Sequence, residues 1–431
     1  MSSSDTIFAL STGRLPSGIA IVRLSGPHVR FAFETMFGAV PAPRVATYGR
    51  VGGTETLDHG LALFFPGPAS VTGEDCGEFH LHGGVAVVKA VLTMLAGLPG
   101  LRPAEAGEFT RRAFLNGKMD LTGAEALSDL IASETEQQRQ LAEASGSKQR
   151  ALYESWRRSI VEIRAGVESD LDFSDQEDVS GLDLRALHGS INRLASSIEA
   201  HAARFRAAEI VRSGYSVAIV GSPNAGKSSL LNALAMNDVA IVSDEAGTTR
   251  DPISVSLDID GFKVVLTDTA GLRSGGGALE KIGMERARHA ARRADLILRL
   301  IDPVAPVFVE VESDAVSVDV WTKSDLLAAP EDALSVSSIG EPDVGSVVRL
   351  IASRVSDVAG VGRSDVLPTR ERHVKHLLSA AGSLRQSAMS DKPEIIAEEL
   401  RFASVEIGRI TGLTDTEELL GEIFSRFCIG K

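Results

Sequence analysis

The spacing of apolar residues divides the chain into three kinds of segment, and the first kind mixes short strands with turns. Apolar runs typical of strands cover residues 18–24, 60–65 and 78–82, and glycines and prolines separate them. One stretch near residues 84–98 has the spacing of a helix. We therefore expect a compact α/β domain over residues 1–118.

The second kind of segment, residues 119–213, is poor in glycine and proline and follows the period of a helix. One stripe has an apolar residue at every third or fourth position, as on one face of a long helix, and consists of Leu152, Trp156, Ile160, Ile163, Val167 and Leu171. A second stripe consists of Leu187, Ile191, Leu194 and Ile198. The acidic segment 170–178 separates the two stripes, and we interpret it as a solvated turn.

The chain is helical again from Thr369 to its end. One helical face there consists of Ile396, Leu400, Ala403, Ile407 and Ile410. A last helix is predicted from Leu420, Ile423, Phe424 and Phe427. Thr414 followed by Glu417 fits a capping box at the start of this last helix.

The third kind of segment, residues 214–358, alternates strands with helices. Its strand-like runs are 215–220, 262–266, 296–301 and 316–321. Alternation of this kind predicts a parallel sheet with covering helices. The predicted fold class is therefore multidomain α/β plus α. An α/β domain with a parallel sheet is inserted into a discontinuous helical domain, whose two parts are residues 119–213 and 359–431.

Composition and charge narrow the classes of function. The longest apolar runs, such as 61–65 and 296–301, are far shorter than the ~20 residues of a membrane helix. The N-terminus lacks the pattern of a signal peptide, and two cysteines, Cys76 and Cys428, fit a reducing compartment, so we expect a cytoplasmic protein without a membrane span. The net charge of −14 argues against a surface that coats nucleic acid everywhere, so an RNA substrate would need a partner or a local patch.

A phosphate-binding motif follows the first strand of the inserted domain. The segment Gly221–Ser228 matches G-x-x-x-x-G-K-S and precedes a helix that begins at Ser229. Its glycines let backbone N–H groups surround a phosphate, and the helix N-terminus favours negative charge. Lys227 is expected to reach the β- and γ-phosphates, and the Ser228 hydroxyl to bind Mg²⁺.

Two further segments complete a nucleotide site. Asp268–Gly271, with the sequence Asp-Thr-Ala-Gly, follows a strand, and an acid at that position holds Mg²⁺ through water. Thr249, in the segment 247–251, is predicted to be the second hydroxyl ligand of Mg²⁺. Guanine selection is assigned to residues 322–325, where Asp325 can accept two hydrogen bonds from the guanine edge.

The guanine-binding loop departs from the usual motif because it begins with Thr322 rather than asparagine. The missing amide normally ties this loop to the base and to the phosphate loop. We predict retained preference for guanine but weaker nucleotide affinity, by about 1 kcal/mol.

The residues that drive hydrolysis are less evident. Leu272 stands where many GTPases have the glutamine that orients water. Glu280, after a glycine-rich stretch, is one candidate for that role, although an acid at this place is also a common first-turn residue of a helix. Asn224 is a candidate ligand of a monovalent cation, and the alternative is a plain turn residue.

Taken together, these motifs resemble the MnmE (TrmE) family of tRNA-modification GTPases over almost the whole chain. The matching stretches outside the GTPase motifs are 5–7, 21–26, 72–75, 82–84, 107–118 and the C-terminal Phe-Cys-Ile-Gly-Lys at 427–431. The resemblance implies a homodimer joined through folate-binding N-terminal domains, with inserted Ras-like P-loop GTPase domains that dimerise on binding GTP and K⁺.

The resemblance also implies roles for individual residues. K⁺ would be held by Asn224, Ser243, Glu245 and Thr248, and Glu280 would position water. A 5-formyl- or 5,10-methylene-tetrahydrofolate would contact Arg23, Glu78, Lys118 and Lys431. Cys428 would lie near its one-carbon unit, as a nucleophile or simply as a small packed residue. For Arg23 and Glu78 the alternative is a structural salt bridge.

The full predicted nucleotide set comprises the three motifs and the segment between them. It consists of Asn224, Ala225, Gly226, Lys227, Ser228, Ser229, Ser243, Asp244, Glu245, Ala246, Gly247, Thr248, Thr249, Asp268, Thr269, Ala270, Gly271, Thr322, Lys323, Asp325 and Ser337.

The function that the resemblance implies is modification of the tRNA wobble uridine. With the FAD-containing partner MnmG, such proteins install an aminomethyl or carboxymethylaminomethyl group at C5, and GTP hydrolysis drives G-domain opening and closing. One alternative is a ribosome-assembly GTPase, which would be expected to carry a basic RNA-binding module. Another is a membrane-remodelling GTPase, which would need an amphipathic or apolar anchor. Neither a basic module nor an anchor is evident in the sequence.

Overall fold

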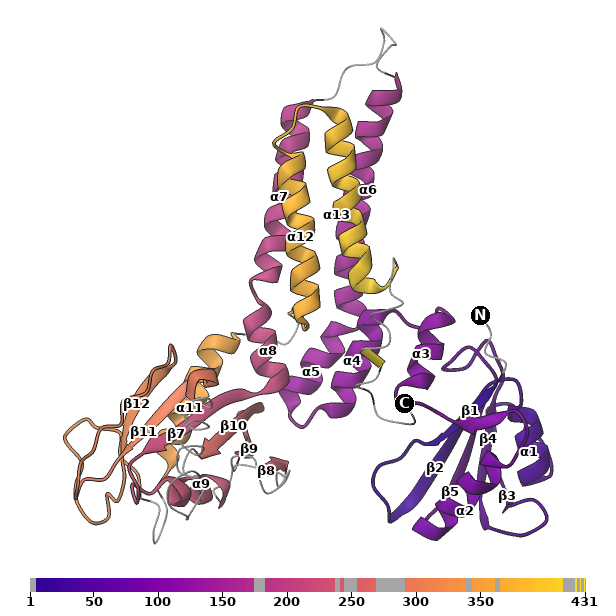
Figure 1. Ribbon diagram of the computed structural model, residues 1–431, viewed down its shortest axis with the longest axis horizontal. Helices are drawn as coiled ribbons and strands as arrows, with labels where there is room; N and C mark the ends of the chain where they lie inside the picture. Colours follow the sequence, from indigo (N-terminus) through magenta and orange to yellow (C-terminus); the bar gives the residue numbers. More distant parts are fainter. Residues whose placement is uncertain are drawn as a thin grey trace, which may run out of the picture. The chain divides into compact units, whose positions relative to one another are not determined.

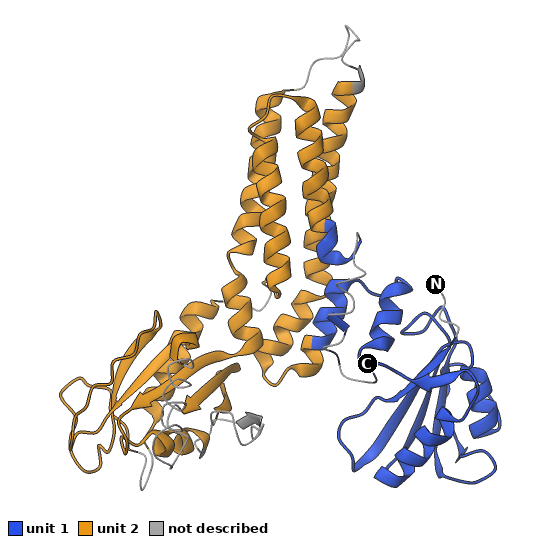
Figure 2. Ribbon diagram, viewed as in Figure 1, with its two compact units in different colours: residues 1–128, 408–431 blue, residues 129–407 orange. Residues whose placement is uncertain are grey.

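The computed structural model describes residues 5–173, 183–236, 241–243, 254–268, 291–337, 343–360 and 365–413, together with 423, 424, 427 and 430. The chain forms two compact units, shown in different colours in Figure 2. Unit 1 comprises residues 1–128 and 408–431, and unit 2 comprises residues 129–407. The C-terminal segment therefore returns to the N-terminal unit.

Unit 1 is built on a six-stranded sheet with the order β3-β4-β5-β2-β1-β6. Neighbouring strands are antiparallel except for β1 and β6, which are parallel. The strands are β1 (Thr6–Leu10), β2 (Ser17–Ser25), β3 (Thr47–Val51), β4 (Asp58–Phe65), β5 (Cys76–Gly83) and β6 (Leu101–Pro103). The helices that begin in this unit are α1 (Val29–Phe37), α2 (Val85–Ala96), α3 (Glu108–Leu115) and α4 (Leu121–Ala132).

One face of this sheet forms the core of unit 1. Because side chains alternate between the two faces of a strand, every second residue of β2, β4 and β5 points toward α1 and α2. The buried cluster on this face contains Val22, Ala62 and Phe79 from the strands, with Phe33 and Leu95 from the helices. The opposite face carries the intervening residues, among them Arg23 and Glu78, which are paired across β2 and β5.

The C-terminal segment packs into unit 1 through aromatic residues. Phe424 and Phe427 are buried against Leu121 and Ala124 of α4. Near the end of the chain, the Ser11 hydroxyl donates a hydrogen bond to the Gly430 carbonyl at 2.8 Å. The capping box at Thr414 and the first part of the predicted last helix lie outside the described residues, and Ile423 and Phe424 are helical.

The helical part of unit 2 contains segments from before and after the inserted domain (Figure 1). Its helices are α5 (Glu136–Ser145), α6 (Ser147–Phe173), α7 (Leu184–Ala202), α8 (Phe205–Ser213), α12 (Glu371–Ser387) and α13 (Pro393–Thr411). Arg385 of α12 pairs with Glu199 of α7 at 2.7 Å, and His376 of α12 lies 2.9 Å from Glu406 of α13. The two helical segments therefore pack into one bundle, as predicted.

The inserted domain contains the second six-stranded sheet, with the order β12-β11-β7-β10-β9-β8. Strands β12, β11, β7 and β10 are parallel, and β9 and β8 add antiparallel pairs at one edge. The strands are β7 (Tyr215–Gly221), β8 (Ile241–Ser243), β9 (Ser254–Ile259), β10 (Phe262–Asp268), β11 (Leu296–Ile301) and β12 (Val316–Trp321). The helices in the described part of this domain are α9 (Lys227–Met236) and α11 (Gly345–Ala359).

The fold class is the predicted one, mixed α/β with a discontinuous helical domain. Two of the predicted strands, 296–301 and 316–321, coincide with β11 and β12. The predicted domain boundaries at residues 118, 213 and 358 stay predictions. In the described part of the chain, every helix is too short or too polar to cross a membrane.

Candidate functional site: a phosphate loop and a guanine-type loop

The phosphate loop joins β7 to α9 at the carboxyl edge of the parallel sheet. Gly226 has a φ of +85°, which a residue with a side chain adopts only at a cost, and Asn224 has a φ of +68°. Asparagine tolerates this left-handed conformation better than most residues. These turns bring the chain back on itself so that α9 begins directly at Lys227, with its N-terminus at the loop.

The Lys227 side chain is buried within this loop, with a relative exposure of 6%. Its Nζ donates hydrogen bonds to the carbonyl oxygens of Gly221, at 2.8 Å, and Ser222, at 2.7 Å. Burial lowers the pKa of Lys227 below its usual value, and the charge of Asp268 opposes this effect. The ammonium group therefore lies at the centre of the loop, where a phosphate would bind.

Ser228 and Asp268 come from different elements and meet beside this lysine. The Ser228 hydroxyl donates a hydrogen bond to Asp268 Oδ2 at 3.0 Å. Strands β7 and β10 are parallel neighbours, so the loop after β7 and the residue that ends β10 share one edge of the sheet. A hydroxyl and a carboxylate are oxygen ligands suited to Mg²⁺. The pair fits the predicted magnesium site.

The guanine-type loop follows β12, and its first residue lies against the phosphate loop. Thr322 is 2% exposed, and its hydroxyl donates a hydrogen bond to the Ile301 carbonyl at 3.3 Å. A Cβ on Gly226 would lie 3.7 Å from Thr322 Cγ2. The Thr322 side chain therefore lies beside the phosphate loop, while its hydroxyl donates to the end of β11.

The rest of this loop is held by polar contacts. The Ser337 hydroxyl donates to Asp325 Oδ1 at 3.1 Å. Lys323 Nζ lies 2.5 Å from Asp302 Oδ2, and the hydrogen bond from Lys323 lowers the pKa of Asp302. Asp302 was not predicted from the sequence. The available signal was its place directly after a buried strand, where polar residues of parallel sheets gather at the binding edge.

Several predicted site residues lie outside the described residues. These are Asp244, Glu245, Ala246, Gly247, Thr248, Thr249, Thr269, Ala270, Gly271, Glu280, Cys428 and Lys431. Ser243 is described as the last residue of β8, without its side chain. Of the predicted K⁺ ligands, the structure describes Asn224 and the backbone of Ser243.

The predicted folate residues of unit 1 include one close pair. Arg23 Nη2 lies 2.9 Å from Glu78 Oε1, and His80 Nε2 lies 2.9 Å from Glu78 Oε2. Lys118 is exposed, and a Cβ on Gly73 would lie 3.1 Å from its Cε. The Arg23–Glu78 contact is compatible with both a ligand-binding role and the alternative of a structural salt bridge.

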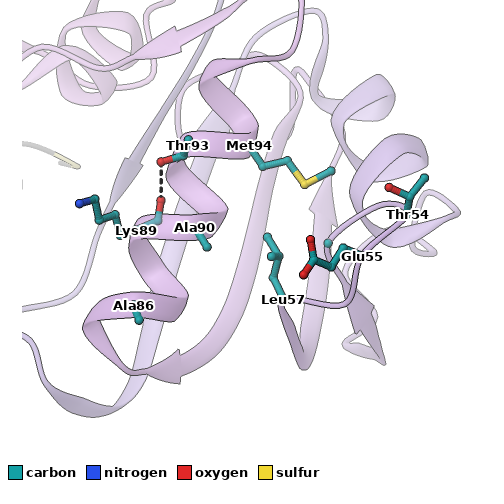
Figure 3. A pocket seen from close by; sticks show the side chains of 9 residues that line it. Thr54, Glu55, Leu57, Ala86, Lys89, Ala90, Thr93 and Met94 are labelled. Atoms are coloured by element: carbon teal, nitrogen blue, oxygen red, sulfur yellow. Dashed lines mark hydrogen bonds between the residues drawn. The ribbon is translucent and has the colours of Figure 1, made fainter.

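Unit 1 also has two surface hollows on the side of its α2 helix. One, of about 580 Å³, lies between α2 and the turn between β3 and β4, with Glu55, Leu57 and Lys89 among its lining residues (Figure 3). Another, of about 660 Å³, is mainly apolar and lies between α2 and β1. The predicted folate residues Arg23, Glu78 and Lys118 are not among the lining residues of either hollow.

The loop after β7, the acid that ends β10 and the guanine-type loop after β12 define the inserted domain as a P-loop nucleotide-binding domain of the GTPase class. The family model "MnmE helical domain" matches residues 121–428, and the model "GTP-binding protein TrmE N-terminus" matches residues 6–118. The chain belongs to the MnmE family of tRNA modification GTPases.

Individual relatives match the chain over nearly its full length. The tRNA modification GTPase MnmE of Chelativorans sp. (strain BNC1) is 50% identical over 99% of this chain and 98% of its own. The protein of the same name from Mesorhizobium japonicum is 49% identical over 100% of both chains. Among solved structures, a point variant of Aquifex aeolicus Era bound to GDP·AlF4⁻ is 21% identical over 41% of this chain and 68% of its own, with a TM-score of 0.27.

Proposed function

We propose that this protein hydrolyses GTP at the carboxyl edge of its parallel sheet and that hydrolysis serves the modification of a tRNA wobble uridine. The observation that carries the proposal is the convergence of Ser228 with Asp268 and of Asp325 with Ser337 at that edge. The first pair suits a phosphate-bound Mg²⁺, and the second orients a carboxylate for guanine. Membership of the MnmE family supports the tRNA substrate.

In this proposal the phosphates lie on Lys227 and on the backbone N–H groups of the loop. Ser228 and Thr249 hold Mg²⁺, which neutralises charge on the β- and γ-phosphates when bound. Asp325 accepts the two donors that guanine has and adenine lacks. Each group acts by binding and orientation, in keeping with phosphoryl transfer, where positioning and electrostatics supply most of the catalysis.

The attacking water and the additional positive charge need further residues. We assign the positioning of water to Glu280 because Leu272 has no polar group for that task. We assign a K⁺ site to Asn224, the backbone oxygens of Ser243 and Glu245, and Thr248. The left-handed backbone of Asn224 and its exposed side chain support this assignment.

The modification chemistry is assigned to unit 1 and to a second protein. Arg23, Glu78, Lys118 and Lys431 would bind 5-formyl- or 5,10-methylene-tetrahydrofolate as the one-carbon donor. A homodimer of this chain would act with an MnmG-type FAD protein to add an aminomethyl or carboxymethylaminomethyl group at uridine C5. Because the substrate is tRNA, we expect this activity in the cytoplasm.

The choice of cation and nucleotide tests the GTPase part of the proposal. We expect the full chain to hydrolyse GTP but not ATP, and to do so much faster in K⁺ than in Na⁺ at equal ionic strength. Equal rates in the two salts would remove K⁺ from the proposal, and equal rates with GTP and ATP would remove guanine selection. A ribosome-assembly switch, the alternative function, would leave wobble uridines unchanged in a deletion strain.

A further inference from the structure

We infer that Asp302 is a positioning residue for guanine-nucleotide binding, which acts by holding the Lys323 side chain at the base-binding edge of the sheet. The inference rests on the proposed function, in which Lys323 belongs to the guanine site. It assigns a role to Asp302, which lies outside the Thr-Lys-Ser-Asp motif at residues 322–325.

The sheet places Asp302 between the two loops that would hold a nucleotide. Asp302 follows β11 directly, and β11 lies between β7, which leads to the phosphate loop, and β12, which leads to the guanine-type loop. In the parallel register Ile301 pairs with Trp321, so Asp302 and Lys323 emerge close together at the carboxyl edge. Ligands of open α/β sheets bind in this region.

The Asp302 carboxylate is held by a backbone hydrogen bond in addition to its contact with the lysine. Its Oδ1 accepts a hydrogen bond from the backbone N–H of Val304 at 3.0 Å, and its Oδ2 lies 2.5 Å from Lys323 Nζ. The Asp302 side chain is 13% exposed and the Lys323 side chain 28% exposed, so the ion pair is partly withdrawn from water. A carboxylate held in this way restricts where the lysine ammonium can lie.

Thr322 and this ion pair attach the same loop to β11. The Thr322 backbone N–H and hydroxyl both donate to the Ile301 carbonyl, at 3.0 and 3.3 Å. The first residue of the loop is therefore tied to β11, and its side chain lies beside Gly226 of the phosphate loop. The charged contact of Lys323 with Asp302 is a second tie between the loop and β11.

The effect on a nucleotide follows from the freedom of a lysine side chain. An unrestrained lysine loses much rotamer freedom when it packs on a base, and a lysine already held by a carboxylate loses less. The long aliphatic stem can cover an aromatic base while the ammonium stays on Asp302. Because this contact concerns the base, it is shared by GTP and GDP and does not change at the γ-phosphate.

The test compares Asp302→Asn with a matched variant, Asp319→Asn, in the full chain. Asp319 pairs with Arg299 at 2.8 Å across the same two strands but within the sheet, away from its carboxyl edge. We expect Asp302→Asn to weaken the binding of fluorescently labelled GDP and GTP roughly fivefold each, with kcat nearly unchanged. Asp319→Asn should leave both affinities unchanged. Equal affinities for Asp302→Asn and the parent would overturn the inference.

A double-substitution experiment separates this inference from the proposed function. In a Lys323→Met background, Asp302→Asn should cause little further loss of GDP affinity, because the aspartate acts through the lysine. If Lys323→Met binds GDP as tightly as the parent, the Lys323 ammonium has no role in binding and the inference is wrong, whereas equal binding of GDP and ADP by the parent would refute the proposed function. If Lys323→Met weakens GDP but Asp302→Asn does not, only the role of Asp302 is wrong.

A conservative variant covers the case in which Asp302→Asn disturbs folding. Asp302→Glu keeps the charge and moves it by one methylene group, so we expect a GDP affinity between those of the parent and Asp302→Asn. Circular dichroism of each variant would report folding separately. An Asp302→Glu variant that is folded and binds GDP as weakly as Lys323→Met would contradict the inference.

Discussion

The Ser228 hydroxyl donates a hydrogen bond to Asp268 across 3.0 Å, although the two residues are forty positions apart in the sequence. Ser228 lies in the first turn of α9, and Asp268 ends β10. The parallel pairing of β7 with β10 brings them together. A hydroxyl and a carboxylate at this distance can share one hydrated Mg²⁺, the serine directly and the acid through water.

Removal of the Ser228 hydroxyl tests this relationship. We expect Ser228→Ala to reduce Mg²⁺-dependent GTP affinity by at least about tenfold and to reduce hydrolysis further, because one metal ligand is lost. The measurement is GTP binding and turnover over a range of Mg²⁺ concentrations. Ser346→Ala is the control, since the Ser346 hydroxyl contacts only the backbone of Ser335 among the described contacts of that side chain. Identical Mg²⁺ dependence of Ser228→Ala and the parent would contradict the metal site.

The unusual residue Thr322 leads to a prediction of increased affinity. Its hydroxyl donates a hydrogen bond to the Ile301 carbonyl, although the Thr322 side chain lies beside Gly226 of the phosphate loop. An asparagine at this position could add one hydrogen bond, worth about 1 kcal/mol or roughly a fivefold lower Kd for both GTP and GDP. Calorimetric titration of Thr322→Asn measures this change. An affinity equal to or below that of the parent would refute the explanation.

A buried histidine in the helical bundle predicts a loss of stability at acid pH. Burial, helped by the charges of His373 and Arg204, lowers the pKa of His201 to about 4 from its usual 6.5. The folded protein therefore keeps His201 neutral, while the unfolded chain takes up a proton as the pH falls from 6.5 to 4. The neutral His201 thus contributes to the free energy of unfolding at pH 7, and this contribution is lost as the pH falls from 6.5 to 4. Between pH 7 and pH 5 the free energy of unfolding decreases by about 2 kcal/mol.

The measurement for His201 is urea unfolding followed by tryptophan fluorescence. Trp156 lies 5.2 Å from the His201 ring, so a Trp321→Phe background isolates its signal. His201→Gln cannot take up the proton and retains a hydrogen-bonding group for the Tyr153 hydroxyl, which lies 3.2 Å from His201 Nε2. We expect a flatter pH dependence in this variant. The same slope in both proteins would show that His201 is not responsible.

A second stability prediction concerns Arg112 in unit 1. Its side chain is 6% exposed and contacts three carboxylates, those of Asp5, Glu74 and Glu108, at 3.0 to 3.1 Å. Arg112→Gln would remove a buried cation from this cluster and leave Arg102 as the arginine that still pairs with Asp5 and Glu108, so we expect a loss of about 3 kcal/mol. Hydrogen exchange of peptides from β1 and α3 in the full chain measures the local effect.

The control for Arg112 is an ion pair on the surface of the same unit. Arg30 lies 3.0 Å from Asp75 and is 56% exposed. Arg30→Gln should cost less than about 1 kcal/mol because water screens the pair. Equal changes in hydrogen exchange for Arg112→Gln and Arg30→Gln would show that the buried cluster around Arg112 stabilises unit 1 no more than the exposed Arg30–Asp75 pair does.

Local sequence predicted the sheet around the nucleotide site well. The strands β11 and β12 were predicted at their observed bounds because each is a strand-length, largely apolar run that turns can delimit. Helix α5 was not predicted individually, since its buried residues are mainly small or polar and give little periodic signal. Strand β1 is short, and its place in the sheet depends on pairing with distant residues.

The residues of the candidate site also fall into those that local sequence predicts and those whose contacts depend on the fold. Motifs at fixed spacing predicted Lys227, Ser228 and Asp268, and the structure places these three side chains at one edge of the sheet. The contact of Asp302 with Lys323 joins residues on different strands, so it depends on the strand order and could not be read from local pattern. Nucleotide, metal and folate binding by the predicted residues stay predictions.

The most direct test of the central proposal is mass spectrometry of the wobble nucleosides of tRNA from a strain that lacks this gene. The account predicts that C5-aminomethyl and carboxymethylaminomethyl uridines disappear, that the wild-type gene restores them, and that a Lys227→Ala variant does not. Unchanged wobble uridines in the deletion strain would contradict the proposed function.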